Sequence, residues 1–387
     1  MKKQLIAMAV AAGMVAPMVA MAEATVYGLA HMSLDFNDDG TDSAMNVSSN
    51  ASRLGFKASQ DLDNGMKAGV QFEGQVDVDQ TGFNMNRNSF ASLGGGFGEV
   101  RIGNHDTPLK DVRSKLDMFG DRVGDLRGLT RLGAIDYSDN SGEVIGSSNA
   151  FDERYKNSIL YISPKIADSW HIKLHYTPNK SQEPASGKNA NDDAAYTVGA
   201  NGMIGPVGLW LAYETYGYTE PRKDESAMRL GLSWKVAAFK INFLFHQQTD
   251  SRIRIIDDTD PDPDNWTTVA SGTYDRTVYS IGGAWKMGKS TFKLQYAMAD
   301  DLDCSFTGGG DCADAKTAAT TMGIGWDYAM SKESTFYVMY AMTANDDDAA
   351  YTVTGGGGHG DNLPATKDNA GKTQDNSAFS VGYIVKF

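Results

Sequence analysis

One stretch of the chain, residues 107–152, concentrates charged side chains of both signs without a regular period. Its acids and bases are Asp111, Asp117, Asp121, Asp125, Asp136, Glu143, Lys110, Arg113, Lys115, Arg122, Arg127 and Arg131. Carboxylates and cationic groups that face each other across a narrow opening create a transverse field, which aligns polar solutes and sets ion preference. The same groups could instead only hydrogen-bond the stretch to a neighbouring wall, so both roles stay open.

Apolar residues within this stretch, such as Leu116, Phe119 and Leu126, argue against a disordered tail. A connection of this length is usually functional or disordered. We therefore expect residues 107–152 to pack against the inside of a wall formed by the flanking segments and to narrow an opening there. An ordinary exposed insertion is the alternative that the local sequence leaves open.

Other residues whose side chains could react or bind a metal do not indicate a catalytic, cofactor or metal site. Cys304 and Cys312 lie eight residues apart without further ligands nearby, so in an exported chain we expect a disulfide between them. The acidic run 257–264 has Pro263 where a calcium loop needs glycine. We expect this run and residues 346–348 to be solvated loops, although weak divalent binding stays open.

The chain's charge and its first residues narrow the class of protein. The formal net charge of -14 argues against nucleic acid as a partner. Residues 1–22 combine Lys2 and Lys3, an apolar run and a small-residue end, as in a secretory signal peptide. We expect residues 23–387 to form one exported domain. No other run of 18 apolar residues indicates a transmembrane helix.

Alternating polar and apolar residues dominate the rest of the chain and predict β-strands. Residues 228–236 show the pattern, with Met228, Leu230 and Trp234 on one face and polar side chains on the other. About 16 strands are expected, at 24–36, 51–61, 65–78, 86–97, 98–106, 153–163, 168–177, 193–203, 206–218, 225–236, 237–249, 273–287, 289–299, 317–330, 333–344 and 376–387.

The apolar faces distinguish a membrane barrel from a soluble β-sandwich. Aromatic residues such as Trp170, Trp285 and Tyr383 fall near the ends of these faces, as the two aromatic girdles of an outer-membrane barrel require. Short turns alternate with long acidic or glycine-rich connections, which fits the two ends of such a barrel. The sequence thus predicts an all-β, antiparallel transmembrane barrel with an aqueous channel. A soluble exported β-protein is the alternative.

Several strings resemble the proteobacterial trimeric general diffusion porins, a 16-stranded Gram-negative family. They are Val26-Tyr27-Gly28, Arg53-Leu54-Gly55-Phe56, residues 87–93, residues 97–103, Asp106-Thr107-Pro108, residues 154–159, Tyr161-Ile162-Ser163-Pro164 and the final Phe387. The resemblance implies a homotrimer in the outer membrane, in contact with lipid and lipopolysaccharide. It also implies passive passage of ions and small hydrophilic solutes, with a third external loop, residues 107–152, folded into the lumen.

The resemblance further implies basic residues on the barrel wall that face acids of the loop. The wall candidates are Arg53, Arg87, Arg101 and Arg154, and by strand parity these point inward together with Lys57 and Lys67. The loop candidates are Asp106, Asp111, Asp117, Asp121 and Asp125. The sequence departs from the family pattern at Leu29 and Leu160, where polar residues are usual.

Two rival functions and the ion preference remain open at this point. A substrate-selective channel for sugars, phosphate or organic acids would use the same barrel. A barrel hydrolase would need a nucleophile motif such as G-x-S-x-G, which the sequence lacks, so no enzyme activity is expected. The negative net charge favours cations at long range, whereas the inward arginines favour anions at the narrowest place. The sequence leans toward cations.

Overall fold

The computed structural model describes residues 23–80, 82–130, 135–139, 142–146, 151–178, 194–217, 225–257, 267–306, 312, 315–354, 366–368 and 371–387. For residues 23, 135–139, 142–146, 252–257 and 267–271 the backbone alone is described. No helix in these ranges is long and apolar enough to cross a membrane.

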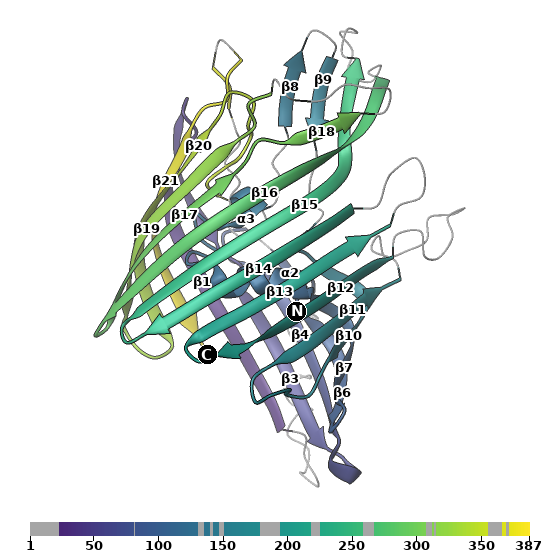
Figure 1. Ribbon diagram of the computed structural model, residues 1–387. Coiled ribbons are helices and arrows are strands. Elements are labelled where there is room, and N and C mark those ends of the chain that lie inside the picture. Colours follow the sequence, from purple (N-terminus) through teal and green to yellow (C-terminus); the bar gives the residue numbers. More distant parts are fainter. Residues whose placement is uncertain are drawn as a thin grey trace, which may run out of the picture.

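Sixteen strands form the wall of a closed antiparallel barrel (Figure 1). They are β1 (Glu23–Asp38), β3 (Arg53–Asp61), β4 (Lys67–Asp77), β6 (Ser89–Gly95), β7 (Gly98–Asp106), β10 (Arg154–Ile162), β11 (His171–Thr177), β12 (Ala195–Ile204), β13 (Val207–Tyr216), β14 (Glu225–Val236), β15 (Phe239–Asp257), β16 (Thr267–Met287), β17 (Ser290–Ala299), β19 (Ala319–Ala329), β20 (Ser334–Asn345) and β21 (Asn376–Lys386). Leu29 of β1 pairs with Arg53 of β3 on one side and Lys386 of β21 on the other. This ring closure confirms the predicted fold.

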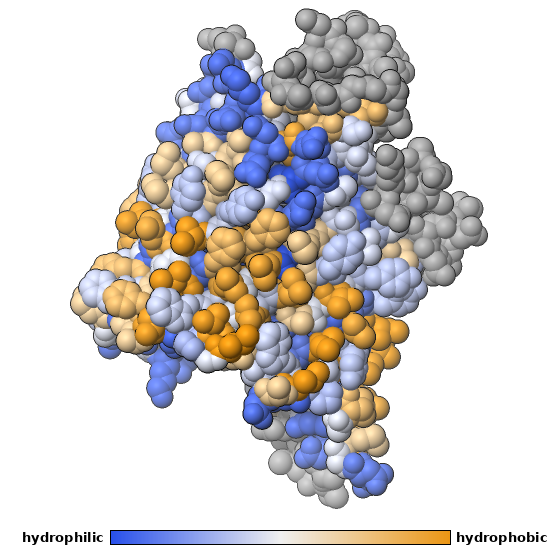
Figure 2. All heavy atoms as spheres, in the orientation of Figure 1, coloured by the Kyte–Doolittle hydropathy of each residue, from blue (hydrophilic) through white to orange (hydrophobic). Residues whose placement is uncertain are grey.

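Alternating burial along each strand separates the two faces of the wall. In β1 the side chains of His31, Ser33 and Asp35 are buried inside, whereas Leu34 and Phe36 are exposed outside. Figure 2 shows the exposed apolar residues gathered in a belt across one face of the barrel, below a hydrophilic region. An outward apolar belt and an inward polar face are what a barrel in a lipid bilayer requires.

Two strands extend further than the sequence predicts. The expected connection 250–272 is shorter in the structure, because β15 continues to Asp257 and β16 begins at Thr267. Both extensions gain backbone partners: β9 (Gly142–Gly146) pairs with β15, and β18 (Asp303–Phe306) pairs with β16. The short strands β2 (Ser43–Ser49) and β5 (Gly82–Asn84) similarly lengthen the wall beside β1 and β4.

The stretch 107–152 contains regular elements that its lack of alternation does not predict. It begins with α2 (Pro108–Leu116), continues with α3 (Arg127–Thr130), and then forms a hairpin of β8 (Ile135–Asp139) and β9. The hydroxyl of Thr107 accepts a hydrogen bond from Lys110 N at 3.2 Å, which caps α2. Proline at the first helical position also favours this start. A short 3-10 turn, η1 (Asp63–Gly65), joins β3 to β4.

A disulfide joins Cys304 in β18 to Cys312, with the two Cα atoms 5.3 Å apart. Replacing both cysteines by serine should lower the free energy of unfolding by about 2–3 kcal/mol, because the bond closes a short loop in the unfolded chain. Denaturant unfolding of the variant and of the reduced protein would measure this loss. Equal free energies of unfolding in the variant, the reduced protein and the unmodified protein would contradict this contribution.

Candidate functional site

The segment 107–130 lies against the inner face of the barrel, where wall glycines leave room for its apolar side chains (Figure 1). A Cβ atom at Gly282 would lie 2.8 Å from Met118 Cγ, and one at Gly323 would lie 2.8 Å from Phe119 Cε2. Such distances are too short for two carbon atoms in contact. Close approach of the segment therefore depends on glycine at these wall positions.

Replacing one of these glycines with a larger residue should displace the segment 107–130 from the barrel wall. Gly323→Leu overpacks the contact with Phe119, at a cost of about 1–3 kcal/mol, and should lower single-channel conductance by moving the segment toward the opening. Gly283→Leu is a matched control, because nothing lies within 4 Å of a Cβ built at Gly283. Equal conductance in both variants and the unmodified protein would contradict this seating.

Wall side chains also bind the backbone of the segment. Met118 N donates to Gln295 Oε1 at 2.8 Å, and Asn242 Nδ2 donates to Leu116 O at 2.6 Å. Lys293 Nζ donates to Met118 O at 3.1 Å. The turn after α2 is therefore held by β15 and β17 at backbone groups that the helix itself leaves unpaired.

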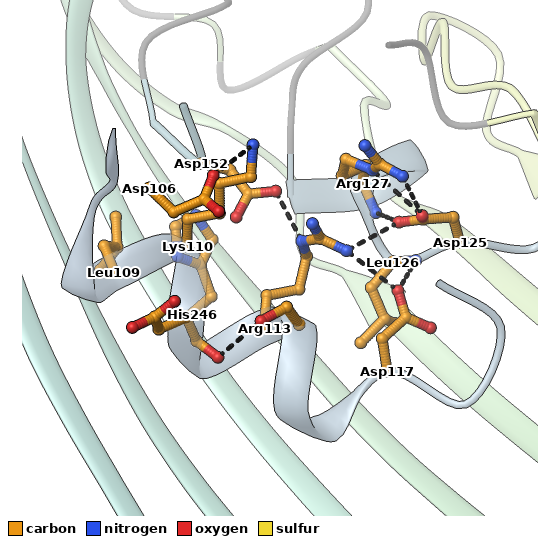
Figure 3. Close-up of polar contacts among 12 residues, drawn as sticks. Asp106, Leu109, Lys110, Arg113, Asp117, Asp125, Leu126, Arg127, Asp152 and His246 are labelled. Atoms are coloured by element: carbon orange, nitrogen blue, oxygen red, sulfur yellow. Dashed lines mark hydrogen bonds and ion pairs between the residues drawn. The ribbon is translucent and has the colours of Figure 1, made fainter. Parts of the chain in front are cut away.

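Buried ion pairs centred on Arg113 hold the segment in shape (Figure 3). Its guanidinium contacts Asp152 at 2.5 Å, Asp125 at 3.1 Å and Asp117 at 3.2 Å. Asp152 also contacts Arg229 of β14 at 2.5 Å, which ties this set to the wall. All five side chains are buried, so they serve the packing of the segment and present no free charge to a solute.

A second set of ion pairs joins Asp121 and Asp125, which lie between α2 and α3, to Arg127 at the start of α3. Arg127 Nη2 contacts Asp125 at 2.5 Å (Figure 3). The same atom contacts Asp121 at 2.6 Å. The Asp121 side chain is 33% exposed, whereas Arg127 is buried. Asp121 therefore contacts Arg127 while part of its side chain reaches solvent.

The three carboxyl groups that contact Arg113 differ in pKa. Burial and the neighbouring carboxylate of Asp125 raise the pKa of Asp117 to about 7. Burial alone would raise the pKa of Asp125, but Arg127 and Arg113 lower it below the ordinary range. Burial is likewise outweighed at Asp152, where Arg113 and Arg229 lower the pKa to about 2.

Raising the pH through 7 should loosen the segment 107–130. Because the pKa of Asp117 is raised on folding, its contribution to stability is full below about pH 4 and is lost as pH rises through about 7. The lowered pKa values of Asp125 and Asp152 change stability only at lower pH. Amide hydrogen exchange in this segment, corrected for intrinsic rates, should be faster at pH 8.5 than at pH 6. In Asp117→Asn that difference should disappear; equal protection at both pH values in the unmodified protein would refute the assignment.

The wall beside the start of the segment carries cationic groups, with Arg87 just before β6 and Arg154 at the first position of β10. Arg87 Nε contacts Glu73 Oε1 at 2.7 Å. Arg154 Nη2 contacts Asp106 at 2.7 Å, and Lys110 of α2 contacts the same carboxylate at 3.3 Å. These side chains are 10–23% exposed, so they reach solvent inside the barrel.

Arg53, Lys173 and Asp111 complete the partly exposed charges near the segment. Lys173 of β11 contacts Asp111 of α2 at 2.5 Å, where the carboxylate is 34% exposed. The side chain of Arg53 in β3 makes no hydrogen bond or ion pair with any residue that the structure describes, although Asp121, Glu73 and Asp106 lie near enough to act on its charge. The charge of Arg53 acts on Arg87, Asp106 and Asp121, and that of Arg154 on Arg87 and Asp106, so these predicted residues lie around one region. Asp111 instead lies beside Lys173.

Other predicted site residues belong to the wall. Arg101 contacts Glu99 at 2.9 Å and the ring of Phe90 at 4.6 Å. Arg101 is five residues from Asp106 along β7, a separation of roughly 16 Å. Lys57 Nζ lies 5.7 Å from the ring centre of Tyr27, whose hydroxyl donates to Glu73 at 2.9 Å, so Lys57 is beside the Arg87–Glu73 pair. Asp106 was expected in the loop, but it is the last residue of β7 and so belongs to the wall.

Two acids of the loop also differ from the expectation. Asp117 and Asp125 were expected to line an opening, yet their side chains are 0% and 2% exposed. Both side chains are buried because their carboxylates contact the buried guanidinium of Arg113. Of the expected loop acids, only Asp111 and Asp121 have about a third of the side chain exposed.

A third cationic set was not predicted. Arg122 contacts Asp327 at 2.6 Å, and Lys293 contacts the same carboxylate at 2.7 Å. The guanidinium of Arg122 also stacks on Tyr337, 4.0 Å from the ring centre. Strand parity could have placed Lys293 and Asp327 inside, but their partner lies in the irregular segment. Among the described residues, no three His, Cys, Asp or Glu side chains are arranged to hold a metal ion.

Comparison with known proteins identifies the class of this barrel. Residues 7–348 match the family of Gram-negative porins, and the chain belongs to that family. It is 26% identical to outer membrane porin protein 32 of Delftia acidovorans, over 96% of this chain and 97% of that protein. It is 25% identical to the major outer membrane protein P.IB of Neisseria gonorrhoeae, over 87% and 92% of the two chains.

Solved structures have the same fold. The anion-selective porin from Comamonas acidovorans has a TM-score of 0.70 at 21% identity, over 95% of this chain and all of that chain. OmpT of Vibrio cholerae in its trimer form has a TM-score of 0.63 at 15% identity, with the same coverage. The protein is therefore an outer-membrane porin, a passive diffusion channel.

Proposed function

We propose that residues 107–130 form the constriction of this channel and that the constriction passes small anions more readily than cations. The observation that carries the proposal is a surplus of positive charge around the segment. Around Asp106 and around Asp327, two cationic groups share one carboxylate, and Arg53 has no carboxylate partner among the described residues. Charged groups at the narrowest place of a pore set its ion preference.

This proposal reverses the lean toward cations that the net charge suggests. The formal charge of -14 is spread over the whole chain, and much of it comes from acidic runs such as 257–264 and 346–348. Charges separated from the pore axis by more than a Debye length, about 8 Å at physiological salt, are largely screened. The cationic groups beside the segment act at shorter range. The anion-selective porin from Comamonas acidovorans, which shares the fold, is consistent with this proposal.

We further propose that the protein assembles as a homotrimer, held in the outer membrane by lipid and lipopolysaccharide. The trimer form of Vibrio cholerae OmpT supports the assembly by analogy of fold. The predicted signal peptide, residues 1–22, lies outside the described residues, and we propose its removal on export. The proposal includes no enzymatic activity and no cofactor.

Planar-bilayer recording tests the proposed constriction and its preference. Each inserted unit of the purified protein should close in three equal conductance steps, one for each pore. With a tenfold gradient of potassium chloride, the reversal potential should have the sign of chloride selectivity. A reversal potential of potassium sign would overturn the anion preference. Closure of each inserted unit in a single step, instead of three equal steps, would overturn the trimer.

A further inference from the structure

Arg276 of β16 carries a buried positive charge that forms no ion pair with any carboxylate in the part of the chain that the structure describes. Its side chain faces the barrel interior, opposite Gln248 of β15, and the residue is 1% exposed. Nη1 donates a hydrogen bond to Tyr351 Oη at 3.1 Å, and the ring of Tyr351 lies 5.6 Å from the guanidinium. The buried atoms Nε and Nη2 have no hydrogen-bond partner in the described part of the chain.

The neighbouring side chains on the inner face do not neutralise this charge. His246 Nδ1 accepts a hydrogen bond from Arg229 Nε at 3.1 Å, so its Nε2 carries the proton and donates to Gln248 Oε1 at 2.9 Å. Asp250, also buried on this face of β15 and two residues beyond Gln248, makes no hydrogen bond with the Nε and Nη2 atoms of Arg276, and Asp152 contacts Arg229. One further buried guanidinium atom, Arg229 Nη2, also lacks a partner. Both unsatisfied groups are hydrogen-bond donors with positive charge.

A buried charge is rarely left without compensation, because removing it from water is strongly unfavourable. Unsatisfied buried donors indicate a bound ion or water. On arginine, Nε–H and Nη2–H point from the same edge of the planar guanidinium. Two parallel donors of this kind match the two oxygens of a carboxylate or phosphate, whereas a water molecule leaves the charge unneutralised.

We propose that the Nε and Nη2 edge of Arg276 binds a small oxyanion, through its carboxylate or phosphate group, between β16 and the segment that carries Tyr351. Tyr351 fixes the guanidinium by occupying Nη1, so the free edge is held in one orientation. The site lies outside the segment 107–130 and does not rest on the proposed constriction. It adds a binding function to a channel that otherwise passes solutes without a bound state.

Anomalous diffraction tests the proposal on crystals of the full-length protein purified in chloride buffers. One set is soaked in arsenate, which has the shape of phosphate, and another in bromoacetate, which supplies a carboxylate. We expect an arsenic peak, or a bromine peak from a bound bromoacetate, whose oxygens lie about 2.7–2.9 Å from Arg276 Nε and Nη2. The soak that gives the peak identifies the class of oxyanion. Ordered water on both nitrogens in both soaks would overturn the proposal.

Thermal unfolding in solution excludes binding at crystal concentration only. Phosphate or acetate, compared with chloride at equal ionic strength, should raise the unfolding temperature of the unmodified protein, because a ligand that binds only the folded state stabilises it. Arg276→Lys keeps the charge but loses the paired donors, and should lose at least half of this rise. Arg101→Lys, at an inward arginine that already contacts Glu99, should keep it. An equal rise in all three proteins would contradict a site at Arg276.

Discussion

Arg113→Met should release the segment 107–130 from the wall and raise single-channel conductance, with a large increase in current noise. Methionine is similar in length to arginine but has no charge. Asp152 and Asp125 would each lose one cationic contact, and Asp117 would lose its ion pair with Arg113. Removing one partner from a buried ion-pair set costs about 3–5 kcal/mol, because the remaining charges stay buried. That loss exceeds the effect expected from any other single change proposed for the segment.

A matched arginine separates this effect from the loss of a charge inside the barrel. Arg101→Met removes a wall arginine whose contact with Glu99 is about one-third exposed, and such pairs contribute only about 0–1 kcal/mol. Its conductance and noise should resemble those of the unmodified protein. If Arg113→Met also does so, residues 107–130 do not control the current. Hydrogen exchange in the same variants would show whether the segment had in fact been released.

The barrel could be predicted from sequence because each strand faces lipid on one side and water on the other. Met228, Leu230 and Trp234 are outside for the same reason that Arg229 is inside, and the chain repeats this pattern until the ring closes. The ends of β15 and β16 escaped prediction because they extend beyond the apolar belt. Their partners β9 and β18 are supplied by other connections, which local sequence does not reveal.

The site could be predicted only where a strand fixes the direction of a side chain. Arg53, Arg87 and Arg154 follow from the wall and the family pattern, and the structure places them around one region. The burial of Asp117 and Asp125 does not follow, because it depends on Arg113 and on glycines such as Gly282 that are distant in sequence. Regular alternation carries no information about a segment that folds back onto the wall.

Arg53→Gln should shift the channel toward cations without disturbing its structure. Arg53 has no ion pair among the described residues, so its loss leaves no carboxylate unpaired. A unit charge about 8 Å from the path of an ion changes that ion's energy by about 1 kcal/mol at an effective dielectric constant near 40. That is about a fivefold change in the permeability of each ion, in opposite directions for anions and cations. Reversal potentials under a potassium chloride gradient would measure it.

Ionic strength distinguishes this direct effect from an indirect one. At 1 M salt the Debye length falls to about 3 Å, so the shift caused by Arg53→Gln should nearly vanish, whereas at 0.1 M it should be large. Arg87→Gln should shift selectivity in the same direction, but it leaves the Glu73 carboxylate without its 2.7 Å partner. Arg101→Gln, distant from the segment 107–130, should have little effect at either concentration. A shift for Arg101→Gln as large as that for Arg53→Gln would mean that the potential of the whole lumen governs selectivity, and the proposed constriction would lose its role.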